Sequence, residues 1–325
     1  MSAFTREQLC AVMNIPFSHR QLEAITAPME PYVIMAGAGS GKTAVMTARV
    51  VWLVATAQVE PSQVLGLTFT NKAAAEFRGR VRKALMDLEV PVDWADATTV
   101  ATYHSFAQQL LVDDGIRIGL EPDLQLLSDV RREQLAMQVV RKPKTIIREL
   151  SHSTKSVVQQ ALDLDNRLAE EAVDPADLRA FDEALLRRMA GLPQQRVGDD
   201  IIATSRKRLE LIGLVEQFRE AKLQRQSIDY ADMIRHALRL VLEREEVVGR
   251  LRDTYRVVLL DEYQDTSVAQ RLLMQHAFGN AHPVTAVGDA LQAIYEWRGA
   301  NAINIIDFKD HFPRRSERGE LTQSP

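Results

Sequence analysis

Two stretches of this sequence have residue types and spacing suited to chemistry on a phosphorylated substrate. The first is AGAGSGKT at positions 36–43, with alanine where the usual pattern begins with glycine. Its glycines let backbone N–H groups close around phosphate oxygens, while the lysine reaches the β- and γ-phosphates and the threonine hydroxyl ligates Mg²⁺. We therefore expect a nucleoside triphosphate to be bound by Ala36, Gly37, Ala38, Gly39, Ser40, Gly41, Lys42 and Thr43.

The second stretch is DEYQDTS at positions 261–267, which follows the apolar run 257–260. Two adjacent carboxylates at the end of a buried strand are costly unless they bind a metal or accept a proton. Asp261 fits a Mg²⁺ ligand beside the phosphate loop, and Glu262 fits the residue that activates the attacking water. The alternative is a solvated acidic turn after a strand.

The residues around the first stretch bear on whether it is a phosphate-binding loop or an ordinary glycine turn. YVIM at 32–35 is typical of a buried strand, and AVMTARVVWLVA at 44–55 has apolar residues at helical spacing. A strand, a glycine-rich turn and a helix in this order are the context in which the pattern indicates a phosphate site. An ordinary turn between strand and helix is the alternative.

Short apolar or β-branched runs that alternate with helical stretches must position these groups. They lie at 32–36, 64–70, 98–102, 257–260 and 284–287, and polar residues follow each of them. Strands separated by helices favour an α/β fold with a parallel sheet covered on both faces. Ligands of such sheets bind beyond the carboxyl ends of the strands, where these polar residues fall.

Strand signals are absent between about 115 and 226, which reads as a helical insertion with a stripe of Leu209, Ile212, Val215 and Phe218. Asp174-Pro175 and the segment 191–193 mark breaks between its helices. We therefore predict a first core segment at 1–114, the insertion at 115–226, a second core segment at 227–312 and a polar tail at 313–325.

Composition limits the class of protein. The 325 residues carry a net charge of −4, so a nucleic-acid surface has to be a local patch. The single cysteine, Cys10, excludes an internal disulfide. No apolar run reaches the length of a membrane span and no signal peptide is apparent, so we expect a cytoplasmic protein without a membrane partner.

Further motifs follow one another along the chain: HRQLEAI at 19–25, LTFTNKAAAEFRGRV at 67–81, TYHSFA at 102–107, SIDYADMI at 227–234 and VGDALQAIYEWRGA at 287–300. With the two stretches above, this series resembles the UvrD/Rep/PcrA-like DNA helicases of superfamily 1. The resemblance implies a RecA-like P-loop NTPase core that uses ATP and Mg²⁺ to move 3′→5′ on DNA. The stretches at 48–55, 63–70, 255–267 and 282–289 look most similar to the motor subunits of the actinobacterial AdnAB helicase–nuclease.

The resemblance also implies roles for matching residues. Gln21 would read adenine, Lys42 and Thr43 would serve phosphates and Mg²⁺, Asp261 would bind the metal, Glu262 would be the base and Gln292 would sense the γ-phosphate. Single-stranded DNA or a 3′-tailed duplex would contact Phe69, Thr70, Asn71, Tyr103, His104, Tyr295, Trp297 and Arg298. Phe69 as core and His104 as a structural histidine are the alternatives. A second helicase–nuclease subunit is a further expected partner.

Several positions depart from the family pattern. Ala44 replaces an arginine often found beside the nucleotide, Ala290-Leu291 and Ala293 replace more polar residues around Gln292, and Glu296 stands beside Trp297 where a small residue is usual. The Glu296 carboxylate would repel nearby DNA phosphates, so we expect it to weaken DNA binding. By the resemblance, arginines from a second core domain stabilise the transferring phosphoryl group. We expect the chain to end before that domain and to turn over little ATP alone.

Two other functions compete with the motor domain. The first is a scaffold that binds ATP and DNA, or a partner subunit, without cycling. The second is a P-loop kinase or GTPase that acts on a small molecule, but this leaves the motifs at 67–81, 102–107 and 287–300 unexplained.

Overall fold

The computed structural model describes residues 4–37, 39–89, 98–121, 123–190, 196–289, 303–315 and 321–322. The chain forms two compact units, one made of Met1–Leu110 with Leu238–Pro325 and the other of Leu111–Ala237. The first contains a parallel β-sheet, and the second consists mainly of helices. Each is described by itself below.

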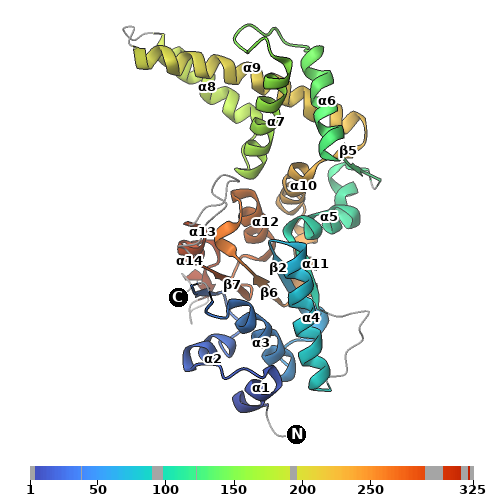
Figure 1. Ribbon diagram of the computed structural model, residues 1–325, viewed down its shortest axis with the longest axis vertical. Helices are drawn as coiled ribbons and strands as arrows, with labels where there is room; N and C mark the ends of the chain where they lie inside the picture. Colours follow the sequence, from blue (N-terminus) through green and yellow to red (C-terminus); the bar gives the residue numbers. More distant parts are fainter. Residues whose placement is uncertain are drawn as a thin grey trace. The chain divides into compact units, whose positions relative to one another are not determined.

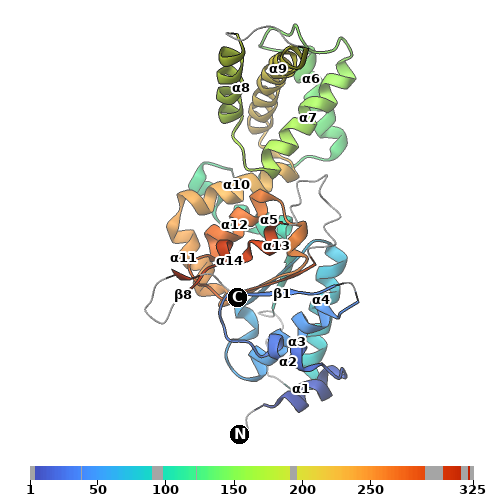
Figure 2. The same ribbon diagram turned by 90° about the vertical axis from the view of Figure 1, so that its left-hand side faces the viewer.

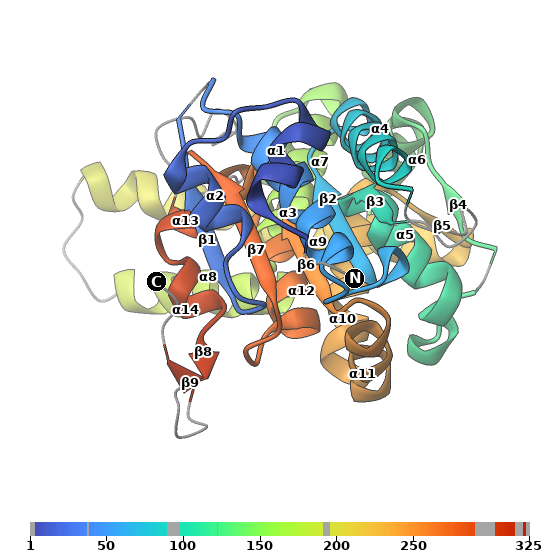
Figure 3. The ribbon, with the colours of Figure 1, turned by 90° about the horizontal axis from the view of Figure 1, so that it is seen from below.

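The first unit is built on a five-stranded parallel sheet in the order β1-β7-β6-β2-β3, which Figure 3 shows from one end. All these strands were predicted from the sequence, so the α/β fold is confirmed. The polar residues that follow β1, β6 and β7 lie at the same edge, because neighbouring parallel strands end together. The strands are β1 (Tyr32–Met35), β2 (Val64–Thr68), β3 (Thr99–Thr102), β6 (Val257–Leu260) and β7 (Val284–Gly288).

Helices cover both faces of this sheet, with α1 to α4 on one side and α12 to α14 on the other (Figure 2). The helices that belong wholly to this unit are α1 (Arg6–Met13), α2 (His19–Ile25), α3 (Lys42–Ala55), α4 (Asn71–Asp87), α11 (Glu245–Thr254), α12 (Val268–Phe278), α13 (Ile303–Ile306) and α14 (Phe308–His311). Two more, α5 (Tyr103–Asp114) and α10 (Tyr230–Glu243), continue from one unit into the other.

One apolar core of the sheet unit joins α3 and α4 to the sheet. Val257 and Leu259 of β6 are fully buried against Val50 of α3 and Phe77 of α4. Successive residues of a strand point to opposite faces, so Val258 and Leu260, also fully buried, pack on the other face. A strand buried on both faces reads as the continuous apolar run seen in the sequence.

The second unit contains the helices drawn in green to gold in Figure 1. They are α6 (Asp129–Arg141), α7 (Thr154–Glu170), α8 (Pro175–Met189) and α9 (Arg196–Gln224). Their core includes Leu135, Val158, Leu162 and Phe218. Asp174 caps α8 and Pro175 occupies its first turn, where a missing N–H costs nothing. The short parallel pair β4 (Gln125–Leu126) and β5 (Ser227–Ile228) was not predicted, because strands of two residues leave no periodic signal.

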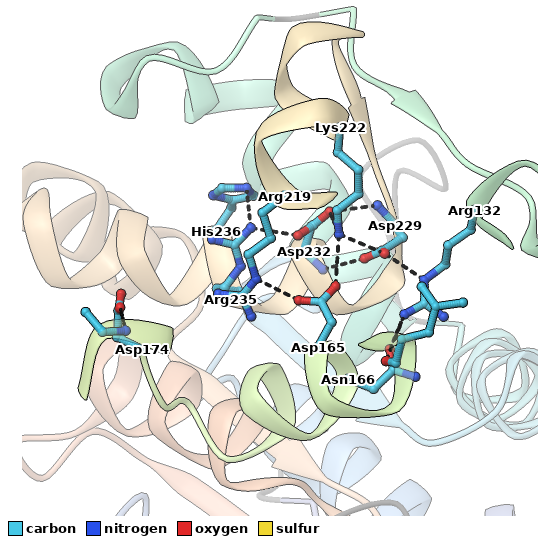
Figure 4. Close-up of polar contacts among 12 residues, drawn as sticks. Arg132, Asp165, Asn166, Asp174, Arg219, Lys222, Asp229, Asp232, Arg235 and His236 are labelled. Carbon is cyan, nitrogen blue, oxygen red and sulfur yellow. Dashed lines mark hydrogen bonds and ion pairs between the residues drawn. The ribbon is translucent and has the colours of Figure 1, made fainter. Parts of the chain in front are cut away.

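A buried cluster of charges joins the helices of this unit to the start of α10 (Figure 4). The Lys222 ammonium, only 2% exposed, lies 3.3 Å from a carboxylate oxygen of Asp165, 2.9 Å from one of Asp229 and 2.7 Å from one of Asp232. Each carboxylate also accepts from an arginine at 2.6–2.9 Å: Arg219 with Asp165, Arg132 with Asp229 and Arg235 with Asp232.

Part of the predicted polar tail is held against the sheet unit. The Arg314 side chain donates to the Pro31 carbonyl at 2.9 Å and lies 3.4 Å from a carboxylate oxygen of Glu30. Arg314 and Arg315 form β8, which pairs with β9 (Leu321–Thr322). Among the described residues, no helix has the length and apolar character needed to cross a membrane.

Candidate functional site

The turn between β1 and α3 has the backbone geometry that a phosphate loop requires. Gly39 and Gly41 have φ of 72° and 82°, a left-handed conformation that side chains rarely adopt. The Ser40 hydroxyl donates to the Gly37 carbonyl at 2.7 Å, which closes the turn on itself. Lys42 and Thr43 then open α3, whose first N–H groups and positive dipole end face the turn. Ala38 lies outside the described residues.

The two stretches predicted to share one substrate meet in space. The Lys42 ammonium lies 3.1 Å from a carboxylate oxygen of Glu262, although the residues are 220 positions apart in the sequence. The pair is formed because β1 and β6 both flank β7 and end at the same edge of the sheet. The Lys42 side chain is 10% exposed and the Glu262 side chain 35%, so a ligand can reach the pair from solvent.

The adjacent carboxylates differ in their surroundings. Asp261 is buried, and this burial, together with repulsion from Glu262, raises its pKa from 3.8 to about 6, although the Glu262 N–H and Lys42 oppose the change. Glu262 has φ of 46°, a left-handed conformation that costs about 1 kcal/mol or more for a residue with a side chain. Strain of this kind is concentrated at functional sites.

The donor set fits Mg²⁺ bound with phosphates. A buried carboxylate held in its charged form next to a second carboxylate is stabilised by a dication. The described residues contain no cluster of three or more His, Cys, Asp or Glu side chains that could hold a metal alone. In the usual Mg²⁺ site of nucleotide-binding proteins, one or two protein oxygens act with waters and substrate phosphates. Thr43 and Asp261 are the residues that would supply those oxygens.

Sequence reasoning gave no role to Gln264, which joins β6 to the end of β7. Its side-chain N–H donates to Glu262 at 2.9 Å, and its carbonyl oxygen accepts the Asp289 backbone N–H at 3.0 Å. Gly288 leaves room for this side chain, because a Cβ there would lie 2.1 Å from the Gln264 oxygen and would displace it. The signal available in the sequence was an amide within DEYQDTS, but nothing in the sequence showed its partner.

Gln21 lies against the phosphate loop. Its side-chain oxygen accepts the Ser18 N–H at 2.8 Å as part of the capping box of α2, and its N–H donates to the Ser40 carbonyl at 3.0 Å. An amide has two donors and two lone pairs, so each end of the group has capacity for one more bond. The Gln21 amide is therefore close to where a nucleotide on the loop would lie.

The residues predicted to follow the DNA track have different positions. Phe69 comes directly after β2 and is half-buried, and Thr70 and Asn71 are exposed at the start of α4. The Thr70 hydroxyl accepts the Ala73 N–H at 3.1 Å and thereby caps this helix. Thr70 and Asn71 thus form an exposed polar helix start, a geometry suited to phosphate contacts.

Tyr103 has a different environment from the other residues predicted to follow the DNA track. It is 1% exposed and lies in the core, and its contact with DNA stays a prediction. Tyr103 comes directly after β3, at the start of α5, where burying its large aromatic ring stabilises the fold more than leaving it exposed would. His104 is half-buried, and burial lowers its pKa, so it is neutral at pH 7. Gln292, Tyr295, Trp297 and Arg298 lie outside the described residues.

The parallel sheet, the phosphate loop and the carboxylate pair at its edge define the class of this protein as a P-loop NTPase motor domain. The N-terminal domain of the UvrD/REP helicase family matches residues 17–313, and the chain belongs to this family.

Similar proteins include a probable DNA helicase II homolog of Mycoplasma capricolum, 32% identical over 93% of this chain, and the ATP-dependent DNA helicase PcrA of Bacillus subtilis, 31% identical over 91%. The PcrA helicase of Staphylococcus aureus is 30% identical over 93%. The chain spans 36–37% of the length of these relatives.

Proposed function

We propose that this chain is the ATP-binding motor domain of a DNA helicase that moves 3′→5′ on single-stranded DNA. The observation that carries the proposal is the contact between Lys42 of the phosphate loop and Glu262 of the carboxylate pair. Helicase relatives that are named ATP-dependent support the choice of ATP. The resemblance to AdnAB motor subunits, with a second subunit and a role in DNA repair, remains a finer prediction within this family.

The proposed chemistry divides among the residues of the site. Lys42 and the loop N–H groups bind the β- and γ-phosphates, and Thr43 with Asp261 holds Mg²⁺, which neutralises phosphate charge when bound. Arrival of the triphosphate gives Lys42 a more highly charged partner than Glu262. Glu262 is then released to orient the attacking water and accept its proton. Gln264 donates one hydrogen bond to the Glu262 carboxylate and orients it.

Nucleotide binding tests the proposal directly. Lys42→Ala is expected to weaken Mg·ATP binding about 100-fold, because several charge-assisted bonds to phosphate are lost. Glu262→Gln is expected to keep binding within about threefold and to abolish hydrolysis, since the base acts in catalysis. Isothermal titration calorimetry with a slowly hydrolysed ATP analogue measures both variants, and Lys83→Ala, an exposed lysine on α4, is the control.

Equal loss of binding in Lys42→Ala and Glu262→Gln would contradict the assigned roles. For these 325 residues alone we expect binding with slow turnover, because the resemblance assigns the transition-state arginines to a second core domain. Phosphate transfer to a metabolite, with no effect of DNA, would favour a kinase over a motor.

DNA binding is tested through Trp297. Stacking of a base on an indole is worth about 1–3 kcal/mol, so oligo(dT) is expected to quench the fluorescence of Trp297 and to bind about tenfold more weakly to Trp297→Ala. Trp52→Phe, a substitution on α3 in the sheet unit, is the control and is expected to keep both the quench and the affinity. A quench that persists in Trp297→Ala would refute the DNA track.

A further inference from the structure

Arg49 is a buried cation on the helix that begins with the phosphate-binding lysine. It follows Lys42 on α3 by about two turns, and its side chain is fully buried. Its guanidinium donates at 2.9–3.2 Å to five oxygens: the carbonyls of Ala24, Ile25, Ala27 and Pro28 and the hydroxyl of Thr285.

Four of these acceptors lie at one place, the end of α2 and the turn after it. The last carbonyls of a helix have no partners within the helix and carry its negative dipole end. They compensate a charge that is costly to bury, and within the described part of the chain Arg49 has no carboxylate partner. Burial lowers its pKa from 12.5 to about 10, so it stays charged at pH 7.

The same short helix carries the candidate adenine-reading residue. α2 spans His19–Ile25, and Gln21 lies on it about one turn before the carbonyls that Arg49 holds. The Gln21 N–H donates to Ser40 in the phosphate loop, so the other end of this short element touches the loop. Arg49 and Lys42 are part of one rigid helix, which fixes α2 and the loop against each other.

We infer that Arg49 is a positioning residue for base recognition: it holds Gln21 at the distance from the phosphate loop at which adenine and triphosphate are bound together. This inference rests on the proposed function, because it needs ATP as the ligand. The Thr285 hydroxyl, which accepts from Arg49, connects the guanidinium to β7, the strand next to β1 in the sheet. A single guanidinium thus connects α2, α3 and β7.

The test is the preference for ATP over GTP, measured by competition against a fluorescent nucleotide. Gln21→Ala is expected to lower this preference about tenfold, since the bonds that read adenine are lost. Arg49→Met is expected to lower it to the same level while GTP affinity changes less than twofold. The double variant is expected to lose no more than either single one, because both act through one contact.

Arg252 provides the matched control. Its guanidinium donates to the carbonyls of Ala277 at 2.8 Å and His276 at 3.1 Å, so it holds the end of α12 as Arg49 holds the end of α2. Arg252→Met is expected to lower the melting temperature but to leave the ATP/GTP ratio unchanged. The ratio therefore separates base recognition from general stabilisation.

If Arg49→Met does not fold, Arg49→Lys keeps the charge with fewer donors, and a ratio between wild type and Gln21→Ala is expected. A wild-type ratio in either Arg49 variant, or equal loss of ATP and GTP binding, would overturn the inference alone. Equal affinity of the unaltered chain for ATP and GTP would also overturn it. Absence of nucleotide binding in the unaltered chain would instead overturn the proposed function, and this inference with it.

Discussion

Replacement of Lys222 by methionine lowers the free energy of unfolding by about 3–5 kcal/mol in our expectation, since it leaves buried carboxylates without their shared cation. Lys222 is 2% exposed and contacts Asp165, Asp229 and Asp232. Their arginines remain, but the carboxylates then repel one another in a buried region, where solvent screens charges weakly. The measurement is urea unfolding followed by circular dichroism, with hydrogen exchange of α7 and α9 to locate the effect.

The loss depends on pH in a defined direction. Burial would raise the pKa of Asp232, but Lys222 and Arg235 outweigh it and hold that pKa below the ordinary value of 3.8. A carboxylate with a lowered pKa stabilises the fold above its unfolded pKa, and this contribution is lost as the pH falls. The difference between wild type and Lys222→Met is therefore largest near pH 7 and shrinks below about pH 4.

Lys144 is the control for this variant. Its ammonium lies 2.7 Å from Glu220, in the same unit, but the two side chains are 67% and 51% exposed. Exposed pairs contribute about 0–1 kcal/mol, so Lys144→Met is expected to change stability little. Equal losses of unfolding free energy in Lys144→Met and Lys222→Met would show that the buried cluster stabilises the fold no more than an exposed ion pair does.

Replacement of Asp261 by asparagine is expected to stabilise the chain at pH 7 by up to about 3 kcal/mol while removing Mg²⁺-dependent nucleotide binding. The pKa of Asp261 is raised from 3.8 to about 6, and each unit corresponds to about 1.4 kcal/mol. The folded state binds this proton more tightly than the unfolded state, so stability falls as the pH rises from about 4 to 6. Asparagine removes that penalty.

Thermal unfolding of Asp261→Asn and wild type at pH 7.5 and pH 4 measures this effect. The gain in melting temperature is expected at pH 7.5 and is expected to disappear at pH 4, where Asp261 is already protonated in the folded chain. Asp232→Asn is the control with the opposite sign, because its carboxylate is stabilised by cations. A destabilised Asp261→Asn at neutral pH would show that the charge at 261 supports the fold.

Much of the fold followed from local pattern. The core strands are apolar runs that end in polar residues, and the predicted break at Asp174-Pro175 is the start of α8. Strand order is different in kind, since the place of β7 between β1 and β6 depends on pairings between distant residues. The pair β4 and β5 was missed because strands of two residues leave no periodic signal in the sequence.

The candidate site could be predicted where a residue stands in a motif whose chemistry allows few other roles. Lys42, Glu262 and the loop glycines could be assigned by chemistry, and the structure brings Lys42 and Glu262 together. Arg49 and Gln264 could not, because an arginine within an apolar helix and an amide within an acidic turn have many uses. The role of Tyr103 could not be fixed by residue type either, because an aromatic residue after a strand can pack in a core or stack on a base, and in the structure it is buried.

The sheet order also determines when this site can be completed on the ribosome. β1 carries the phosphate loop and lies at the sheet edge beside β7, and it ends at Met35, whereas β7 begins at Val284. At about 5–20 residues per second, translation needs roughly 10–50 s to pass from one to the other. The helical unit of Leu111–Ala237 emerges in full during that interval. The phosphate loop therefore remains without the strand that neighbours β1 until almost all of these residues have been synthesised.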